Sequence, residues 1–326
     1  MNLESGQRIW QLLELMADGE FHSGEKLAQG LQLSRATVFN AMAGAEKLGV
    51  GLQRIRGRGY RLNQSWQPLD MAITRQFLQE SFAARFQLEL LRQATSSNAV
   101  LLQRAAQGAP CGSVLAVELQ TAGRGRMART WHSGLGNALT FSLLWRFDCA
   151  LNALSGLSLA IGVAIIRALQ KFSAQGVALK WPNDVLTAHG KLGGVLIEAQ
   201  GDMLGPCAVV IGIGLNCTLP MHLEQRIDQP ASALVQVCTA MPGRNQLLAV
   251  LLQELAQVLD EFSEHGFVNL RAEWERHHMR QDAMISLHLP DGSMISGIAK
   301  GVGDTGELRV ATAQGLRSFN SGEVGA

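Results

Sequence analysis

Residues 114–131 read Val-Leu-Ala-Val-Glu-Leu-Gln-Thr-Ala-Gly-Arg-Gly-Arg-Met-Ala-Arg-Thr-Trp. The apolar run at the start of this stretch, Val114–Leu119, is typical of a buried strand. Gly123 and Gly125 allow the following backbone to bend sharply and to approach a ligand closely. The three arginines among them, Arg124, Arg126 and Arg129, supply forked donors that match phosphate or carboxylate. The stretch predicts an anion-binding loop at a strand end, although arginine–glycine runs also occur as solvated or nucleic-acid-binding loops.

Around this loop, from about residue 70 to 278, strand-like and helical patterns alternate, which predicts a mixed sheet backed by helices. The expected strands are Leu88–Leu91, Val114–Leu119, Ala138–Leu144, Ala178–Trp181, Leu192–Ala199 and Cys207–Ile213. The expected helices are Asn98–Ala106, Leu154–Phe172 and Arg244–His265.

Residues 1–64 predict a small helical unit. Ile9, Leu12, Leu13 and Met16 recur at helical spacing before Gly19, Ser23 can cap a second helix, and Ser34 a third that ends at Gly49. A hairpin, 50–62, follows with a basic tip that contains Arg56 and Arg58. This is the pattern of a winged helix-turn-helix, and Arg35, Thr37 and Asn40 would reach DNA from the third helix. A three-helix packing module without DNA contact is the alternative. The polar stretch Asn63–Pro68 is interpreted as a linker.

Residues 279–326 have a different pattern. Met284–Leu289, Ser293–Val302 and Glu307–Ala311 are short strand candidates separated by tight-turn residues, which predicts a small β-barrel. The expected class for the whole chain is therefore α+β with three domains, at 1–64, 70–278 and 279–326.

Composition narrows the class further. The 326 residues are 47% hydrophobic and 17% charged, as in a folded chain, and the net charge of +1 requires any DNA contact to come from a local patch. The five cysteines are widely spaced without a Cys-x-x-Cys pair, which argues against a zinc site or a disulfide framework and favours small buried thiols in a reducing compartment. The start of the chain lacks signal-peptide features, and the apolar run Leu154–Leu169 is interrupted and short for a membrane span. We expect a soluble cytoplasmic protein.

Five segments in order carry a resemblance. Ser96-Ser97-Asn98, Gln120–Arg126, Lys180-Trp-Pro-Asn-Asp184, Lys191–Glu198 and Gly212-Ile-Gly-Leu-Asn216 together resemble the biotin protein ligases. The head, through 19–25 and 57–60, resembles that of biotin-operon repressors, so the chain is similar to the bifunctional subgroup. The resemblance implies an SH3-like C-terminal barrel, ATP with Mg²⁺, and biotin as substrate. It also implies a biotin carboxyl carrier protein of acetyl-CoA carboxylase as acceptor, operator DNA as partner, and a homodimer formed on adenylate binding.

The same resemblance assigns roles to residues. Lys191 and Arg126 match the catalytic positions. The biotin contacts would be Ser96, Ser97, Asn98, Gln120, Arg124, Gly125, Arg126 and Lys191. The nucleotide contacts would be Arg126, Arg129, Asn183, Asp184 and Asn216, with Asp184 also holding Mg²⁺. Ala128 departs from the family, which commonly has glycine there. Because alanine disfavours positive φ, we expect altered loop geometry or closure rate but retained activity.

Each of these residues could instead have a purely structural role. Ser96–Asn98 could be only helix caps, Pro182-Asn-Asp only a turn, and Lys191 an ordinary lysine after a turn. For the whole chain, a regulator that binds its effector without catalysis and a lipoate ligase are the competing functions. The intact lysine and arginines argue against the first, and the DNA-binding head argues against the second.

Overall fold

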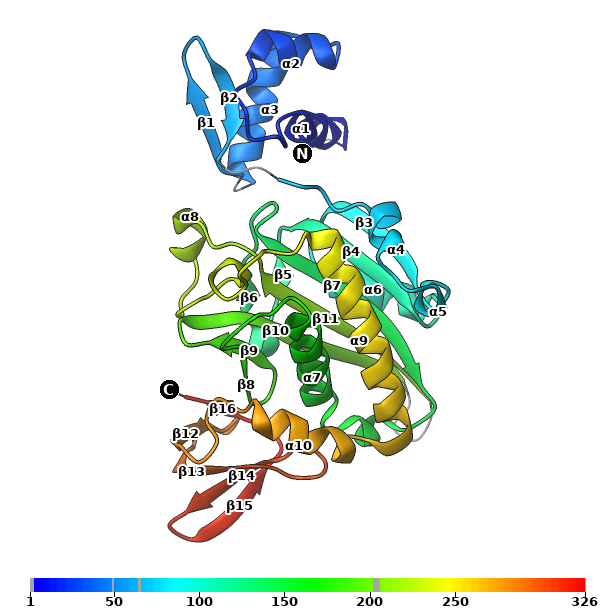
Figure 1. Ribbon diagram of the computed structural model, residues 1–326, viewed down its shortest axis with the longest axis vertical. Helices are drawn as coiled ribbons and strands as arrows, with labels where there is room; N and C mark the ends of the chain where they lie inside the picture. Colours follow the sequence, from blue (N-terminus) through cyan, green and yellow to red (C-terminus); the bar gives the residue numbers. More distant parts are fainter. Residues whose placement is uncertain (1–2, 49, 64–65, 202–205, 326) are drawn as a thin grey trace.

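The computed structural model describes residues 3–48, 50–63, 66–201 and 206–325. The chain forms three units in the predicted order, with the helical head and the C-terminal sheet at opposite ends of the central sheet (Figure 1). This arrangement leaves the central unit in contact with both of the others.

The head contains α1 (Leu3–Leu15), α2 (Gly24–Gly30) and α3 (Arg35–Lys47), followed by the hairpin β1 (Leu52–Ile55) and β2 (Gly59–Leu62). The predicted caps are confirmed, because Ser23 Oγ accepts from Lys26 N at 3.1 Å and Ser34 Oγ accepts from Thr37 N at 3.0 Å. The expected helix end at Gly49 lies outside the described residues. The predicted winged helix-turn-helix is therefore confirmed in its described part.

The segment between head and central unit is not a free linker in its described part. Trp66 is 5% exposed, and its ring lies 6.0 Å from that of Trp10 in the head. Leu119 and Leu135 of the central unit belong to the same apolar cluster. Gly136, at φ +70°, leaves the room that the Trp66 ring occupies, since a Cβ there would lie 2.6 Å from Trp66 Cδ1. The head is thus packed onto the central unit through a tryptophan wedge.

The central sheet has seven strands in the order β3-β4-β7-β11-β10-β9-β8. Their bounds are β3 (Gln87–Ala94), β4 (Ser113–Gln120), β7 (Ala138–Phe147), β8 (Ala178–Lys180), β9 (Asp184–Thr187), β10 (Gly190–Gly201) and β11 (Cys207–Asn216). β3 and β4 are parallel and the other neighbours are antiparallel, so the predicted mixed sheet is confirmed. Sequence reasoning missed β9, a four-residue strand directly after the predicted turn.

Helices cover both faces of this sheet. α6 (Ser97–Ala106) packs with Leu115 and Val117 on one face, whereas α7 (Leu157–Gln170) and α9 (Arg244–His265) pack with Val114 and Ala116 on the other. This division follows from the alternation of side chains along β4. The shorter helices are α4 (Met71–Gln76), α5 (Glu80–Ala83), α8 (Met221–Glu224) and α10 (Val268–Arg276), none of which was predicted.

The apolar segment around α7 is a core helix. Leu151–Gln170 is long and apolar enough to cross a membrane by composition alone, but it includes a short 3-10 turn, Leu151–Leu154, ahead of α7. Within α7, eleven of fourteen residues are buried between the sheet and α9. Its hydrophobicity is therefore explained by the protein interior.

The C-terminal unit is a five-stranded antiparallel sheet in the order β15-β14-β13-β12-β16. The strands are β12 (Met284–His288), β13 (Met294–Val302), β14 (Leu308–Thr312), β15 (Gly315–Phe319) and β16 (Glu323–Val324). The predicted small C-terminal β-unit is confirmed. Trp181 of the central unit donates its indole N–H to the Gly306 carbonyl at 2.9 Å, which fixes this sheet beside β8.

One expectation about the cysteines is only partly met. Cys207 and Cys217 are buried, but Cys111 is exposed and Cys149 and Cys238 are half-buried. All five are free thiols.

Candidate active site

A cavity of about 640 Å³ opens on the face of the sheet that carries α6. It is lined by the first residues of α6, by the arginine loop after β4, and by glycine-rich parts of β10 and β11. Two glycines of β11 make the room. A Cβ on Gly212 would overlap the Asn98 side chain, and one on Gly214 would lie 2.6 Å from the Trp131 indole. The glycine-rich strands therefore let functional side chains lie directly on the sheet.

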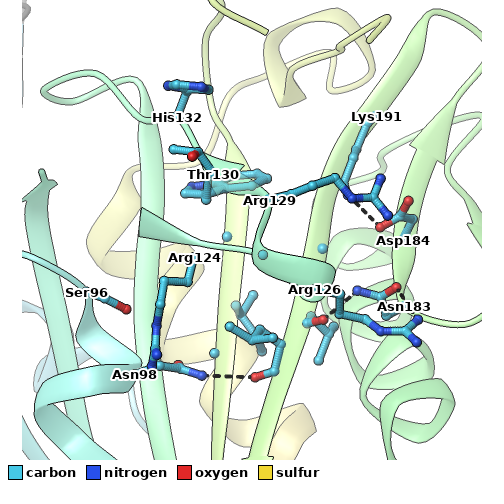
Figure 2. Close-up of a pocket in the computed structure, with 18 of the residues that line it drawn as sticks. Ser96, Asn98, Arg124, Arg126, Arg129, Thr130, His132, Asn183, Asp184 and Lys191 are labelled. Atoms are coloured by element: carbon cyan, nitrogen blue, oxygen red, sulfur yellow. Dashed lines mark hydrogen bonds and ion pairs between the residues drawn. The ribbon is translucent and has the colours of Figure 1, made fainter. Parts of the chain in front are cut away.

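One side of the cavity is polar and carries a single ion pair. Asn98 Nδ2 donates to Glu198 Oε2 at 3.0 Å, and Arg124 Nη2 donates to the same oxygen at 2.8 Å. Ser142 Oγ lies 2.7 Å from Ser97 Oγ and 2.5 Å from Asn98 Oδ1. Figure 2 shows Ser96, Asn98 and Arg124 together on this side. The network orients both donors and acceptors toward the cavity, which suits a neutral polar ligand.

Gln120 and Ser96 belong to this polar side. Gln120 Oε1 accepts from the backbone N–H of Ser97 at 2.7 Å, which ties the strand end to the start of α6. Ser96 occupies the N-cap position, but its side chain makes no capping hydrogen bond. The simpler reading of Ser96 as a side-chain cap is therefore not supported.

The arginine loop is a folded element. Gly123 pairs with Trp131 and Arg124 with Thr130, forming a hairpin of β5 (Gly123–Arg124) and β6 (Thr130–Trp131). The 3-10 turn between them, Arg126–Ala128, contains two left-handed non-glycine residues, Met127 at φ +53° and Ala128 at φ +59°. Alanine thus adopts the positive φ for which the family commonly has glycine, at a cost of about 1–2 kcal/mol. Ala128 therefore tolerates the left-handed conformation that its side chain disfavours, and a changed rate of loop closure stays a prediction.

The other side of the cavity is charged. Lys191 Nζ lies 2.6 Å from Asp184 Oδ1, with both side chains largely buried. Arg126 Nη1 donates to Asn183 Oδ1 at 3.3 Å, and Asn183 Nδ2 donates to the Val195 carbonyl at 2.7 Å. Figure 2 shows Asn183, Asp184 and Lys191 on this side, opposite Ser96 and Asn98. Burial lowers the pKa of the Arg126 guanidinium, an effect that Asp184 opposes. A partly desolvated cation of this kind attracts anions strongly.

The C-terminal unit contributes a residue that sequence reasoning missed. Glu323, the first residue of β16, lines the cavity and lies 2.7 Å from Arg129 through Oε1 and Nη1. The arginine loop is therefore bound to a different domain. Nothing local in the sequence around Glu323 indicated this contact, since the partners are almost two hundred positions apart.

Asn216 is placed differently from the other predicted residues. It is 3% exposed and is not among the residues that line the cavity. Its Nδ2 donates to the carbonyls of Lys191 at 3.3 Å and Ser232 at 3.0 Å. Because its amide group holds the backbone next to Lys191, a direct ligand contact is not supported in this conformation. In this structure Asn216 links the backbone of Lys191 to that of Ser232.

All the other residues predicted for the small-molecule site meet at this cavity. They are Ser96, Ser97, Asn98, Gln120, Arg124, Gly125, Arg126, Arg129, Asn183, Asp184 and Lys191. Besides Glu323, the sequence reasoning missed Trp131 and His132, which line the cavity, and Glu198, which anchors Arg124. Glu198 could have been predicted as a site residue, because it is a charged residue that directly follows the apolar run Leu192–Ile197.

The head carries a separate basic surface. Arg35, Asn40, Arg56 and Arg58 are exposed, while Thr37 is half-buried and helps to cap α3. Arg58 stacks over the Phe21 ring at 4.2 Å, and Arg54 over Phe39 at 4.5 Å. Among the described residues, these arginines have no carboxylate partner. Such a surface can contact phosphates from both the wing and α3.

The two sides of the cavity indicate which kind of ligand it can bind. Uncharged donors and acceptors lie next to a cluster of cations, so the cavity can hold a polar ligand whose reacting end is anionic beside a phosphate. Within the described part of the chain, no group of three or more His, Cys, Asp or Glu side chains could bind a metal by itself. A cation at this site would need ligands from the bound molecule.

Comparison with known proteins agrees with this geometry. The pattern of the Biotin/lipoate A/B protein ligase family matches residues 90–216, an HTH domain matches 8–61, and the Biotin protein ligase C terminal domain matches 284–324. The bifunctional ligase/repressor BirA of Escherichia coli is 31% identical over 96% of this chain and 95% of its own length. The biotin–[acetyl-CoA-carboxylase] ligase of Mycobacterium tuberculosis is 35% identical over 74% of this chain and 89% of its own.

A solved structure is also similar. The biotin protein ligase from Aquifex aeolicus in complex with biotin and ATP superposes with a TM-score of 0.62 and 26% identity, covering 73% of this chain and 97% of that one. The ordered motifs, the shared domains and the near-complete alignment to the Escherichia coli protein lead to one conclusion. The chain belongs to the biotin/lipoate A/B protein ligase family and, within it, to the bifunctional ligase/repressor branch.

Proposed function

We propose that this protein is an ATP-dependent biotin–[biotin carboxyl carrier protein] ligase. It forms biotinyl-5'-adenylate and transfers biotin to a lysine of the carrier protein of acetyl-CoA carboxylase. It also acts as a ligand-dependent repressor of biotin-synthesis genes. A chain with a DNA-binding head and five free cysteines fits the cytoplasm.

The observation that carries the ligase proposal is the two-sided cavity. The ureido ring of biotin has one carbonyl acceptor and two N–H donors, and Ser96, Ser97 and Asn98 with Gln120 offer both kinds of partner. The carboxylate of biotin and the phosphates of ATP are anions and require the opposite, cationic side. A regulator that only sensed biotin would need one cation for the carboxylate, but not the group formed by Arg126, Arg129 and Lys191.

In the first step, an oxygen of the biotin carboxylate attacks the α-phosphorus of ATP. The bond between the α-phosphorus and the oxygen that joins it to the β-phosphorus breaks, and the electron pair of that bond leaves with pyrophosphate. Both reactants are anionic, so the main demand is charge neutralisation. Lys191 is held by Asp184 and its backbone by Asn216, which suits it to lie between carboxylate and α-phosphate. Arg126 and Arg129 would neutralise the phosphates.

In the second step, the acceptor lysine amine attacks the carbonyl carbon of the mixed anhydride, and AMP leaves with the electron pair of the broken carbon–oxygen bond. Arg124, anchored by Glu198, would hold the adenylate while the carrier protein docks. The β5–β6 hairpin covers one wall of the cavity, so Gly125 can bring its backbone close to the ligand.

Mg²⁺ would enter with the nucleotide. Three carboxylates, Asp184, Asp228 and Glu323, line the cavity among the described residues, too sparse a set for a protein-only site. That donor set fits an ion that keeps several waters and is held mainly by phosphate oxygens. Asp184, with Asn183 beside it, is the residue that we assign to it.

The test is covalent transfer. Labelled biotin, ATP, Mg²⁺ and a carrier domain should give labelled carrier, with Lys191→Met inactive. Lys300→Met is the matched control, since Lys300 and its ion-pair partner Asp282 are both exposed. Biotin binding without pyrophosphate release would identify a sensor instead, and preferential transfer of lipoate would identify a lipoate ligase.

For repression, we propose that Arg35, Thr37 and Asn40 read operator bases and that Arg56 and Arg58 contact phosphates. Two heads on a two-fold axis double these contacts, so adenylate-induced homodimers should bind an operator more tightly than monomers. Sedimentation with and without biotinyl-adenylate, followed by operator titration, tests this. A chain that lacks residues 1–64 should keep transfer activity and lose operator binding, and retained operator binding would refute the assignment.

A further inference from the structure

Two cations beside the cavity have no assigned task. Lys180 is half-buried and ends β8, and Arg280 lies in the segment between α10 and the C-terminal sheet. Among the described residues, neither side chain makes a hydrogen bond or ion pair, and Arg280 Nε is buried without a partner. Unpartnered buried polar groups are rare in folded proteins and call for a ligand or another reason.

The orientation of Lys180 follows from the strands. Leu179 packs against Gly162 of α7, so the next side chain, Lys180, faces the opposite side of the sheet, where the cavity lies. Lys180 pairs with Asp184 across β8 and β9, and cross-strand partners project from the same face. Asp184 in turn binds Lys191 at 2.6 Å. Lys180 is therefore the second lysine around the same carboxylate.

The backbone brings Arg280 to the same place. Leu179 N donates to the His277 carbonyl at 2.7 Å, and Met279 N donates to the Leu179 carbonyl at 2.9 Å. These two bonds form a parallel bridge between Leu179 and His278, which holds the segment that enters the C-terminal sheet alongside β8. Lys180 follows Leu179 directly, and Arg280 is the second residue after His278. Burial lowers the pKa of Lys180, an effect that Asp184 and Glu323 oppose and that the positive charges of Lys191 and Arg280 reinforce.

The balance of positive and negative side chains near the cavity indicates an anionic ligand. Asp184 and Glu323 lie near four cations, namely Arg126, Arg129, Lys180 and Lys191, and Arg280 lies near Lys180. Asp228 is the third carboxylate that lines the cavity. Asp184 is paired with Lys191 and Glu323 with Arg129. Arg126, Lys180 and Arg280 are left without a carboxylate partner among the described residues. Such an excess of positive charge at a partly buried place is stabilised by a polyanion.

We infer that Lys180 and Arg280 form a second anion subsite, at the junction of the central and C-terminal sheets, which holds the β- and γ-phosphates of the nucleotide. This inference rests on the proposed function. When the α-phosphorus is attacked, the negative charge of the broken bond moves onto pyrophosphate, so cations at this end stabilise the leaving group. Arg280, which lies between α10 and β12, would then make the C-terminal unit part of nucleotide binding.

The test separates the two half-reactions. Lys180→Met and Arg280→Met keep apolar volume and remove charge, and Lys300→Met, at an exposed position paired with Asp282, is the control. Each site variant should raise the KM for ATP and the dissociation constant of pyrophosphate about tenfold to a hundredfold, the range for a lost charged hydrogen bond. The KM for biotin should stay within about twofold of the wild-type value, and Lys180→Arg should restore most of the ATP affinity.

Transfer from supplied biotinyl-adenylate to the carrier gives the decisive comparison, because the adenylate has no β- or γ-phosphate. That half-reaction should be spared in both site variants. Equal loss of both half-reactions, or an unchanged KM for ATP and unchanged pyrophosphate binding, would overturn the subsite. Pyrophosphate binding by calorimetry needs no biotin chemistry. If the wild-type protein formed no adenylate, the proposed function would fail, while weakened pyrophosphate binding by Lys180→Met would still support an anion subsite.

Discussion

The buried ion pair between Glu118 and Arg244 offers the sharpest test of how the molecule is held together. Glu118 lies in the middle of β4 with a side chain 2% exposed, and Arg244, the first residue of α9, is 7% exposed. Arg244 Nη1 donates to Glu118 Oε2 at 2.8 Å, and its Nη2 donates to the Gln67 carbonyl at 2.8 Å. Glu118 also accepts from the Leu69 backbone N–H. The pair thus clamps the chain that descends from the head onto the sheet.

Glu118→Ala would leave the Arg244 guanidinium buried without its counter-ion. Breaking a buried pair in this way costs about 3–5 kcal/mol of unfolding free energy. For a unit of this size each kcal/mol shifts Tm by about 2–4 °C, so a drop of about 6–20 °C is expected. The double variant Glu118→Ala/Arg244→Met removes both charges and should lose less stability than the sum of the losses of Glu118→Ala and Arg244→Met. It should not recover fully, because the carbonyl of Gln67 and the N–H of Leu69 lose their partners, at about 1–3 kcal/mol each.

Urea unfolding followed by tryptophan fluorescence and circular dichroism measures all four corners of the cycle. Arg104→Met is the control, because its pair with Glu89 is exposed and should be worth at most about 1 kcal/mol. A Glu118→Ala variant within 1 kcal/mol of wild type, or a double variant whose loss equals the sum of the singles, would refute the reasoning.

Three further predictions concern the cavity and the domain junction. Lys191→Ala should lower the rate of adenylate formation about 10²–10³-fold with an unchanged Tm, since one positioned electrostatic donor is removed; near-normal activation by pyrophosphate release would contradict its role. Arg126→Gly should speed dissociation of the adenylate more than it slows synthesis, as measured by trapping released intermediate, and an unchanged off-rate would make Arg126 a catalyst rather than a latch. Burial lowers the pKa of His278, which lies under Trp274 with its Nε2 unpartnered. Its folded pKa is therefore below the unfolded value of about 6.5, the unfolded chain binds the proton first, and stability should fall as pH drops through 6.5 toward the folded value. His278→Phe should flatten that part of the stability–pH curve relative to wild type, and an identical slope would refute it.

Much of the architecture is encoded locally. Ser23 and Ser34 cap their helices, and Arg244–His265 is helical over its whole predicted length, because capping and amphipathic periodicity act over a few residues. The arginine loop after Val114–Leu119 could also be predicted, since its glycines and cations are contiguous. The local sequence therefore determined the longest helices, most of the strands and eleven of the 26 residues that line the cavity.

The partners of those residues were decided by the tertiary structure. Glu198 reaches Arg124, Glu323 reaches Arg129, and Arg244 reaches Glu118, in each case from a distant part of the chain. A local pattern cannot encode such pairs, because they exist only once sheet order and domain packing bring the strands together. Asn216 illustrates the converse, since a residue at the motif end became a buried support for Lys191.

The difference between local preference and long-range packing also explains the conformation of Ala128 and the burial of Trp66. Propensity alone disfavours alanine at φ +59°, yet the surrounding β5–β6 hairpin holds it there. A polar stretch predicted a linker, yet Trp66 is buried between the head and Leu135. In both cases long-range packing outweighs a local preference of about 1–2 kcal/mol. The sequence by itself thus determined the longest helices, most of the strands and the charged residue types of the arginine loop. Only the tertiary structure decided which charges meet, because the free energy of an ion pair or an apolar contact depends on distance in space and not along the chain.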